Sequence, residues 1–231
     1  MDYRKRTFTA QPGRSILLTE SLKQYSIQPP QKILDIGCGT GELLFSLANT
    51  FVTSRVVGID ISLGNIMSIN LKNDKPDQIQ TVHENFNIFR GENFDAVVSD
   101  TSLHLIDDNP HAIFARIKSL MRPGGILVFT APVACWHNRI LWCFRWSARL
   151  CRGHFLNNFA LYVAKQLYPT WPEPLLTQRL EYLYVLWRWE DSKHLKELLK
   201  ALGFQLLKNT LQPQISFAKP HHSLSVYRLE K

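Results

Sequence analysis

Residues 35–42 read DIGCGTGE, and they follow the short apolar segment KIL at 32–34. Glycines occupy every second position here, at Gly37, Gly39 and Gly41, and the helix-like segment LLFSLA comes next. A strand, a glycine turn and a helix N-terminus place backbone N–H groups and a positive dipole end around a ligand. Glycine also permits positive φ and lacks the Cβ that would block close approach. The stretch therefore predicts a ligand cradle at the end of a first strand.

The glycine spacing bears on which ligand the cradle takes. A dinucleotide fingerprint reads G-x-G-x-x-G or A, and its last position falls on Glu42, which weakens the pyrophosphate interpretation. Asp60 ends the next strand candidate, where a carboxylate can accept both hydroxyls of a ribose. Asp35, inside the turn, is a tolerable neighbour for a ligand that carries an amino group and a sulfonium. The ligand that fits these residues is S-adenosylmethionine.

Strand-like and helix-like segments alternate from about residue 32 to 131. The strand candidates are KILDI, RVVGID, IQTVH, FDAVVS and GILVFTA, and the helix candidates between them are GELLFSLANTF, SLGNIMSINLK and NPHAIFARIKSLM. Near the C-terminus, Ser192 can cap the helix KHLKELLKAL, Gly203 can stop it, and the strand candidates FQLLKNTL and SLSVYRLE follow. The pattern predicts an α/β fold with a doubly wound, mostly parallel seven-stranded sheet and an antiparallel edge strand.

Four of these segments carry a family resemblance. ILDIGCGTG resembles the first motif of the class I S-adenosylmethionine-dependent methyltransferases, and VVGIDIS resembles the acidic end of their second strand. ENFDAVVSDTSLHLI is similar to their fourth strand and its loop, and LMRPGGILVFTAP to the turn into their fifth strand. The resemblance covers about residues 32–132 and implies a Rossmann-like, small-molecule type of methyltransferase over a single domain, residues 1–231.

The resemblance also implies a set of cofactor residues. The glycines would let the backbone meet the methionine part of S-adenosylmethionine, Asp60 would hold the ribose, and Ile61 would lie against the adenine. Glu84 or Asn85 would meet the adenine amino group, and the loop that begins at Ser99 would border the sulfonium. The complete set is Asp35, Gly37, Cys38, Gly39, Gly41, Asp60, Ile61, Glu84, Asn85, Phe86 and Ser99.

Methyl transfer needs a base only if the acceptor must lose a proton. His104, in SDTSLHLIDD, is the first candidate because its ordinary pKa is near neutral, and Asp100 is the second. The alternative is that His104 packs under the loop and that Asp100 stabilises it. The sequence SDTS differs from the N-P-P-Y tetrad of relatives that methylate nucleobase or amide nitrogen, which counts against that chemistry.

Residues 133–190 differ in character, since they hold all six tryptophans and read as helices broken by YPTWPEP. In the resembling family an insertion after the fifth strand often forms a lid that selects the substrate. Trp136, Ile140, Phe144 and Ala148 follow a four-residue step. This step is open to four interpretations: a core-facing helix, a homodimer face, a membrane-surface helix, or a platform for single-stranded RNA. At the other end, residues 1–31 are expected to form a helical cap, which would bring Tyr3 or Phe8 near the cofactor.

Composition limits the remaining classes. The formal charge is +8, but the cations are scattered, so a solvated basic surface is expected and nucleic acid is disfavoured as partner. The four cysteines show no CxxC spacing, so no metal and no disulfide framework are expected. No apolar leader or membrane span is evident, and we expect a cytoplasmic location. The sequence thus predicts methylation, on O or N rather than C, of a small, partly apolar or aromatic acceptor. An RNA or lipid-headgroup methyltransferase and an inactive cofactor-binding subunit remain as alternatives.

Overall fold

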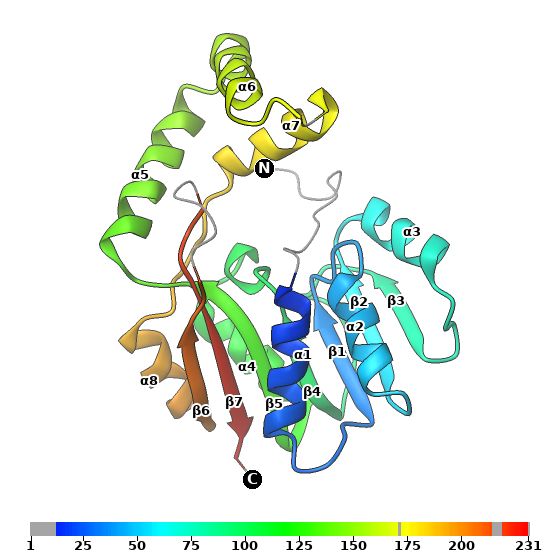
Figure 1. Ribbon diagram of the computed structural model, residues 1–231. Coiled ribbons are helices and arrows are strands. Elements are labelled where there is room, and N and C mark those ends of the chain that lie inside the picture. The colour runs from blue at the N-terminus through cyan, green and yellow to red at the C-terminus, as the bar shows by residue number, and fades with distance from the viewer. Residues whose placement is uncertain (1–12, 171, 214–218, 231) are drawn as a thin grey trace.

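The computed structural model describes residues 13–170, 172–213 and 219–230, in which helices cover both faces of a seven-stranded sheet (Figure 1). The strands are β1 (Lys32–Ile36), β2 (Arg55–Asp60), β3 (Ile79–His83), β4 (Phe94–Ser99), β5 (Met121–Pro132), β6 (Phe204–Leu211) and β7 (His222–Leu229). All six residues of β4 are buried. This burial explains why the central strands are mainly apolar rather than alternating apolar and polar residues.

The sheet order is β3-β2-β1-β4-β5-β7-β6. β1 to β5 pair in parallel, and β7 runs antiparallel to both β5 and β6. The prediction of a doubly wound, mostly parallel sheet is confirmed; the antiparallel strand is β7, which leaves β6 at the edge. The strand order reverses between β1 and β4. Ligands of such sheets bind at this reversal, outside the carboxyl ends of the strands.

Two helical layers enclose the sheet. The helices are α1 (Arg14–Tyr25), α2 (Glu42–Thr50), α3 (Leu63–Lys72), α4 (Pro110–Leu120), α5 (Trp136–Leu150), α6 (His154–Leu167), α7 (Glu173–Leu180) and α8 (Lys193–Ala201), with short 3₁₀ helices η2 (Leu103–Leu105) and η3 (Glu181–Tyr184). Apolar side chains of α1, α2 and α3 share one core cluster with the strands. Those of α4 and α8 share a second cluster, on the other face.

Local signals set the ends of several helices. Asn109 caps α4 by accepting a hydrogen bond from the N–H of Ala112, and Pro110 occupies the first helical position. Ser192 caps α8 as the sequence predicts. Gly203, with φ of 87°, follows the end of that helix in the left-handed conformation that glycine tolerates best.

The N-terminal segment differs from the expected cap. α1 packs on the sheet face beside α2, and Leu18 and Leu22 are fully buried there. Within the described part of residues 1–31, α1 belongs to the helical layer on one face of the sheet, because its apolar face is buried against the strands. The expected contacts of Tyr3 and Phe8 lie outside the described residues.

The segment after β5 leaves the sheet as a helical arm, defined here as α5, α6, α7 and η3 (Figure 1). Within the arm, α5 packs on η3 and α6 on α7. The chain returns beside its point of departure, since the N–H of Asp191 donates to the carbonyl of Pro132 at 2.7 Å. The predicted helical, tryptophan-rich insertion after the fifth strand is thus present.

Asn138 fastens the first turn of α5 to the sheet. Its side-chain amide donates to the carbonyls of Val133 and His221 at 2.8 and 2.9 Å. Its side-chain oxygen accepts from the N–H of His221 at 2.8 Å. Because Asn138 is fully buried, these bonds form away from water and fix how α5 leaves β5.

No helix in the described part of the chain is long and apolar enough to cross a membrane. Among the same residues, no group of three or more His, Cys, Asp or Glu side chains is arranged to hold a metal ion.

Candidate functional site: the glycine turn and the loop after β4

The glycine turn connects β1 to α2 and requires glycine at several positions. Gly37, Gly39 and Gly41 have φ of 72°, 55° and 93°, all in the left-handed region. A Cβ on Gly37 would lie 2.4 Å from the Cβ of Ser102, and one on Gly41 would lie 2.9 Å from the Cγ1 of Ile69. The turn therefore presents backbone rather than side chains at the carboxyl end of β1.

Asp60 closes the turn from the end of β2. Its two carboxylate oxygens accept hydrogen bonds from the N–H groups of Gly39 at 2.9 Å and Ser62 at 2.8 Å. Burial raises the pKa of Asp60, and these two bonds act in the opposite direction. Each carboxylate oxygen can accept more than one bond, so Asp60 is fixed in place and still able to receive ribose hydroxyls.

Asp35 is the least satisfied polar group of the turn. It is 1% exposed, and neither carboxylate oxygen has a hydrogen-bond partner among the residues that the structure describes. Burial raises the pKa of Asp35 well above its ordinary value, and the nearby carboxylates of Asp100, Asp60 and Glu42 raise it further. A buried carboxyl group without a partner is costly. The site therefore fits a ligand that brings a cationic group to Asp35.

The loop after β4 is tied to the end of β1. The hydroxyl of Ser99 donates to the carbonyl of Ile36 at 2.9 Å and lies 2.6 Å from the hydroxyl of Ser102. Thr101 has φ of 55°, a strained conformation for a β-branched residue. Its N–H donates to the hydroxyl of Thr130 at 2.9 Å. Neighbouring strands thus hold a strained loop against the glycine turn, as at many functional sites.

Asp100 is held by two side chains. Its Oδ1 accepts from a guanidinium N–H of Arg14 at 3.2 Å and from the hydroxyl of Thr130 at 2.7 Å. The side chains of Arg14 and Asp100 are only 11% and 8% exposed. These contacts favour the loop-stabilising role for Asp100, and its role as a base stays a prediction.

His104 lies in η2 and is 5% exposed. Its ring meets that of Trp189 edge-on, with centroids 6.1 Å apart, and lies 6.0 Å from the ring of His222. Burial lowers the pKa of His104 well below its ordinary value, and His222, Arg14 and Arg145 lower it further. Its Nδ1 has no hydrogen-bond partner among the described residues. His104 is therefore a neutral imidazole, able to exchange a proton but weakly basic.

The residues expected around the adenine meet at the ends of β2 and β3. Ile61 is partly buried, and the N–H of Glu84 donates to the carbonyl of Asp60 at 3.1 Å. The side chain of Asn85 accepts the N–H of the residue two positions on, at 3.0 Å, and Phe86 belongs to a core cluster. Of the four, Ile61 and Glu84 keep side chains that no described hydrogen bond or core packing uses. Their contacts with a cofactor stay predictions.

Cys38 contributes differently from its neighbours in the turn. Its sulfur packs toward Leu44 and Gly58, where a Cβ on Gly58 would lie 3.0 Å away. Burial raises the pKa of this thiol well above its usual value. A cofactor contact from Cys38 is therefore limited to its backbone.

Three residues of the site were missed in the sequence. Arg14 is the first residue of α1 and belongs to no motif, Thr130 lies within β5, and His222 begins β7. Thr130 and His222 meet Asp100 and His104 only because β5 and β7 pair beside β4, and Arg14 reaches Asp100 from the start of α1. His222 could have been suspected from the pair of histidines that opens its strand.

A separate cavity of about 640 Å³ lies along α5 and is lined by Trp142, Trp187 and Trp189 with Arg139 and Arg188 among others. None of the predicted cofactor residues lines it. Trp189 is shared, since it borders this cavity and also meets His104.

Residues 34–129 match the family model described as a methyltransferase domain. The chain carries a methyltransferase domain. The match includes β1, β2, β3 and β4 almost completely, with the glycine turn, Asp60 and the loop after β4. The resemblance to the class I S-adenosylmethionine-dependent methyltransferases is therefore confirmed, and the arm lies outside the matched residues.

Two curated relatives are each similar to less than half of this chain. A malonyl-[acyl-carrier protein] O-methyltransferase from Hahella chejuensis is 35% identical over 100 residues, covering 43% of this chain and 36% of that protein. A trans-aconitate 2-methyltransferase from Deinococcus radiodurans is 31% identical over 111 residues, covering 46% and 39%. The chain thus matches less than half the length of either relative.

A solved structure extends the likeness to nearly the whole chain. The 1,6-didemethyltoxoflavin-N1-methyltransferase of Burkholderia thailandensis, bound to 1,6-didemethyltoxoflavin and S-adenosylhomocysteine, superposes with a TM-score of 0.64. It is 17% identical and covers 95% of this chain and 79% of its own. At this identity the likeness establishes the fold around the methyltransferase domain.

Proposed function

We propose that the protein binds S-adenosylmethionine and transfers its methyl group to a small acceptor. The observation that carries this proposal is Asp35, a buried carboxyl group whose oxygens have no partner among the described residues. It lies beside a turn of positive-φ glycines and within electrostatic reach of Asp60. A pyrophosphate would add negative charge to this acidic site, whereas an ammonium and a sulfonium would neutralise it.

Different residues of the site would bind different parts of S-adenosylmethionine. Asp35 would face the cationic methionine end, the glycine backbone would allow that end to approach, and Asp60 would accept the ribose hydroxyls. Ile61 and Glu84 would border the adenine. When bound, the cofactor supplies a methyl group activated by its sulfonium.

The chain has to align the acceptor and exclude water, because in-line transfer needs little else. His104 is neutral, and its Nδ1 can take a proton from an acceptor hydroxyl or N–H. Since burial makes it a weak base, it suits an acceptor whose proton is fairly acidic, such as a phenol. A carboxyl group is already ionised near neutral pH and needs no base. A neutral amine needs only placement.

A small, partly apolar or aromatic acceptor agrees with the surroundings of His104. Trp189 and His222 border its ring, and the helical arm leaves the sheet beside them, which favours a role for the arm as a substrate lid. The two curated relatives and the solved structure are named for methylation of small or carrier-bound molecules, at oxygen in one and at N1 in another. These names support O- or N-methylation here.

Calorimetry tests the cofactor. The purified chain should bind S-adenosylmethionine and S-adenosylhomocysteine, and Asp60→Ala should weaken both about tenfold or more, as expected when a charged hydrogen-bonding group is lost. Asp77→Ala, at an exposed carboxylate in the turn before β3, is the matched control. Binding of NAD without binding of S-adenosylhomocysteine would contradict the proposal.

Product identification tests the acceptor. Incubation with methyl-labelled cofactor and extracts of the source cells should yield a labelled small molecule that mass spectrometry can identify. His104→Ala should then lower kcat more than it raises KM if the histidine takes a proton. Tight cofactor binding with no labelled product would favour an inactive cofactor-binding subunit instead.

A further inference from the structure

The exposed side of α5 is the apolar side, which reverses the usual arrangement of a surface helix. The exposed large side chains of this helix are Trp136 at 69%, Ile140 at 61%, Phe144 at 58%, Trp146 at 47% and Leu150 at 67%. Together they are called the α5 face. Exposed single apolar residues are ordinary, but five large ones on one helix form a patch of the kind that marks an interaction site.

Polar residues occupy the buried side of the same helix. His137, Asn138 and Arg145 are at most 7% exposed. Asn138 binds the backbone of His221, and Arg145 donates to the carbonyl of Val185 at 3.2 Å. These bonds fix the rotation of α5 about its axis, so the helix cannot turn its apolar side inward without breaking them.

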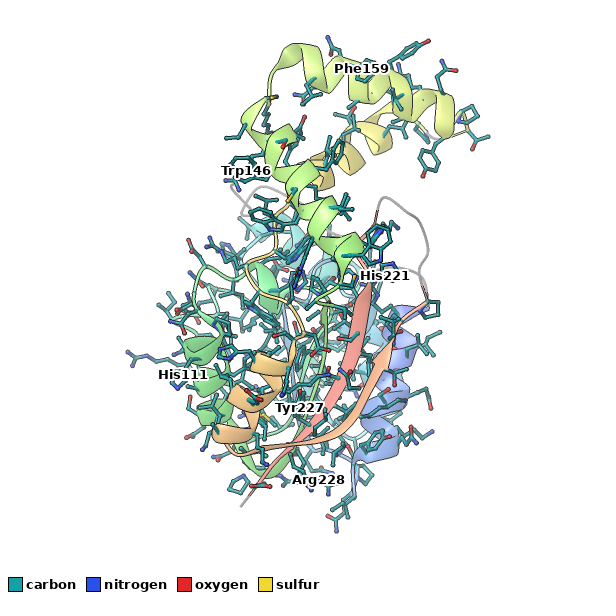
Figure 2. The ribbon with its side chains drawn as sticks, turned by 90° about the vertical axis from the view of Figure 1, so that its left-hand side faces the viewer. His111, Trp146, Phe159, His221, Tyr227 and Arg228 are labelled. Carbon is teal, nitrogen blue, oxygen red and sulfur yellow. The ribbon has the colours of Figure 1, made fainter. Side chains whose placement is uncertain are left out.

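α6 also exposes large apolar side chains. Phe159, Tyr162 and Val163 are 57%, 62% and 37% exposed. Figure 2 shows Trp146 on α5 and Phe159 on α6, both on the arm that stands clear of the sheet.

The charges on α5 and the turn that follows it are all positive. Residues 133–153 contain Arg139, Arg145, Arg149 and Arg152 but no Asp or Glu, whereas Lys165 on α6 pairs with Glu173 on α7 at 2.7 Å. Arg139, Arg149 and Arg152 are exposed, at positions between the apolar residues of the α5 face and just after them. Large apolar side chains interspersed with arginines are typical of helices that lie in the interface of an anionic membrane.

We propose that the α5 face, with Phe159, Tyr162 and Val163 of α6, docks this protein peripherally on an anionic phospholipid bilayer. The apolar side chains enter the boundary between headgroups and acyl chains, and the exposed arginines meet lipid phosphates. Aromatic residues such as Trp136 and Trp146 suit the interface because one part of each ring system is apolar and the indole N–H is polar.

Two other occupants fit the observations less well. A two-fold interface between copies brings the same patch of each copy together. The exposed arginines of one α5 face would then lie against those of the other, and α5 has no carboxylate to separate them. Single-stranded RNA would use the aromatic rings for stacking, but it leaves Ile140, Leu150 and Val163 without a role.

The test is sedimentation of the full chain with vesicles of phosphatidylcholine alone or mixed with phosphatidylglycerol. The protein should bind the anionic vesicles, and binding should weaken as salt is added. Ile140→Ser with Phe144→Ser should weaken binding about tenfold or more, because both side chains leave the membrane interface. The control is Val52→Ser with Leu71→Ser, at side chains that are 73% and 87% exposed but lie elsewhere.

Charge is tested separately. Arg139→Gln with Arg149→Gln should weaken binding to anionic vesicles by about fivefold for each arginine removed, since each contributes about 1 kcal/mol near such a surface. Lys23→Gln with Lys72→Gln, at exposed lysines on α1 and α3, should leave binding unchanged.

Several outcomes would overturn the inference. The first two are absence of binding to anionic vesicles and equal binding by the Ile140/Phe144 variant. The others are that the protein, in place of binding vesicles, forms a dimer that the variant substitutions disrupt, or binds RNA in a salt-dependent manner. The measurement needs no cofactor, so it is independent of the proposed methyl transfer. Unchanged affinity of the variants for S-adenosylhomocysteine, with unchanged thermal unfolding, shows that they are folded.

Discussion

Gly37 has no room for even one methyl group. An alanine there would place its Cβ 2.4 Å from the Cβ of Ser102, at a φ of 72° that side chains rarely adopt. We expect Gly37→Ala to destabilise the fold by about 2 kcal/mol or more, from strain and overpacking together, and to abolish cofactor binding. Denaturant unfolding and calorimetry measure the two effects.

Gly124→Ala is the matched control for this substitution. Gly124 has φ of 81°, but a Cβ there would meet no atom within 4 Å. It should therefore cost only the backbone strain, about 1 kcal/mol, and leave cofactor binding intact. Equal losses in the two variants would show that the contact with Ser102 is unimportant.

Asp35 should trade stability for binding. Because its pKa is raised in the folded protein, the stabilisation it gives is fully present below its unfolded pKa and is lost as pH rises through the folded pKa. Near neutral pH, the buried carboxyl group of Asp35 therefore lowers the free energy of unfolding. Asp35→Asn removes this destabilisation and should raise the melting temperature of the cofactor-free protein, by about 2–4 °C for each kcal/mol gained.

The same substitution should weaken binding of S-adenosylmethionine. Affinity of the unmodified protein should rise with pH as Asp35 loses its proton, and the Asn variant should lack this dependence. Thermal unfolding and calorimetry over a pH series measure both effects. A variant that is less stable without cofactor would show that Asp35 has a structural partner.

At the residue scale, the sequence predicted the part of the site that lies along one stretch of chain. Gly37, Gly39, Gly41 and Asp60 could be placed because strand, turn and strand end follow each other in order. Thr130 and His222 could not, since their meeting with the loop after β4 depends on β5 and β7 being neighbours. The sequence also gave no sign that His104 is buried, which determines its pKa.

At the level of the helices and strands, a substitution can test whether Asn138 holds α5 on the sheet. Asn138 makes three hydrogen bonds while fully buried. Asn138→Ala leaves buried backbone groups unsatisfied and should lower the free energy of unfolding by about 2–4 kcal/mol. Gln166→Ala, at an exposed glutamine on α6, is the control. A loss below about 0.5 kcal/mol would mean that α5 is held by other contacts.

Strands were predictable where short apolar runs are bounded by turn residues. KILDI, RVVGID, IQTVH and FDAVVS coincide with β1 to β4, because short β-branched runs between turn residues have few alternatives. The orientation of α5 was not predictable. Its four-residue apolar step suits a core-facing helix equally well, and only the tertiary bonds of Asn138 and Arg145 turn that step outward, so the core-facing interpretation is wrong for Trp136, Ile140 and Phe144.

For the whole molecule, buried histidines should make the fold sensitive to acid. Burial lowers the pKa of His222 from 6.5 to about 3 and also lowers that of His104. The stabilisation is complete above the unfolded pKa and is lost as pH falls toward the folded values, because the unfolded chain binds protons first. The free energy of unfolding should therefore fall by up to about 1.4 kcal/mol per pH unit for each such histidine.

His222→Gln should flatten this dependence, and His111→Gln should not, since His111 lies on the surface of α4 (Figure 2). Urea unfolding between about pH 7 and pH 5 measures the slope. Identical slopes in all three proteins would place the acid sensitivity elsewhere.

The hydrogen bond between Asp191 and Pro132 brings the two ends of the arm together at one edge of the sheet. Because its two ends lie side by side, the helical arm can change in length or sequence while the strands of the sheet keep their pairing. Evolution, or an engineer, can therefore exchange the part that meets the surroundings without redesigning the part that holds the cofactor.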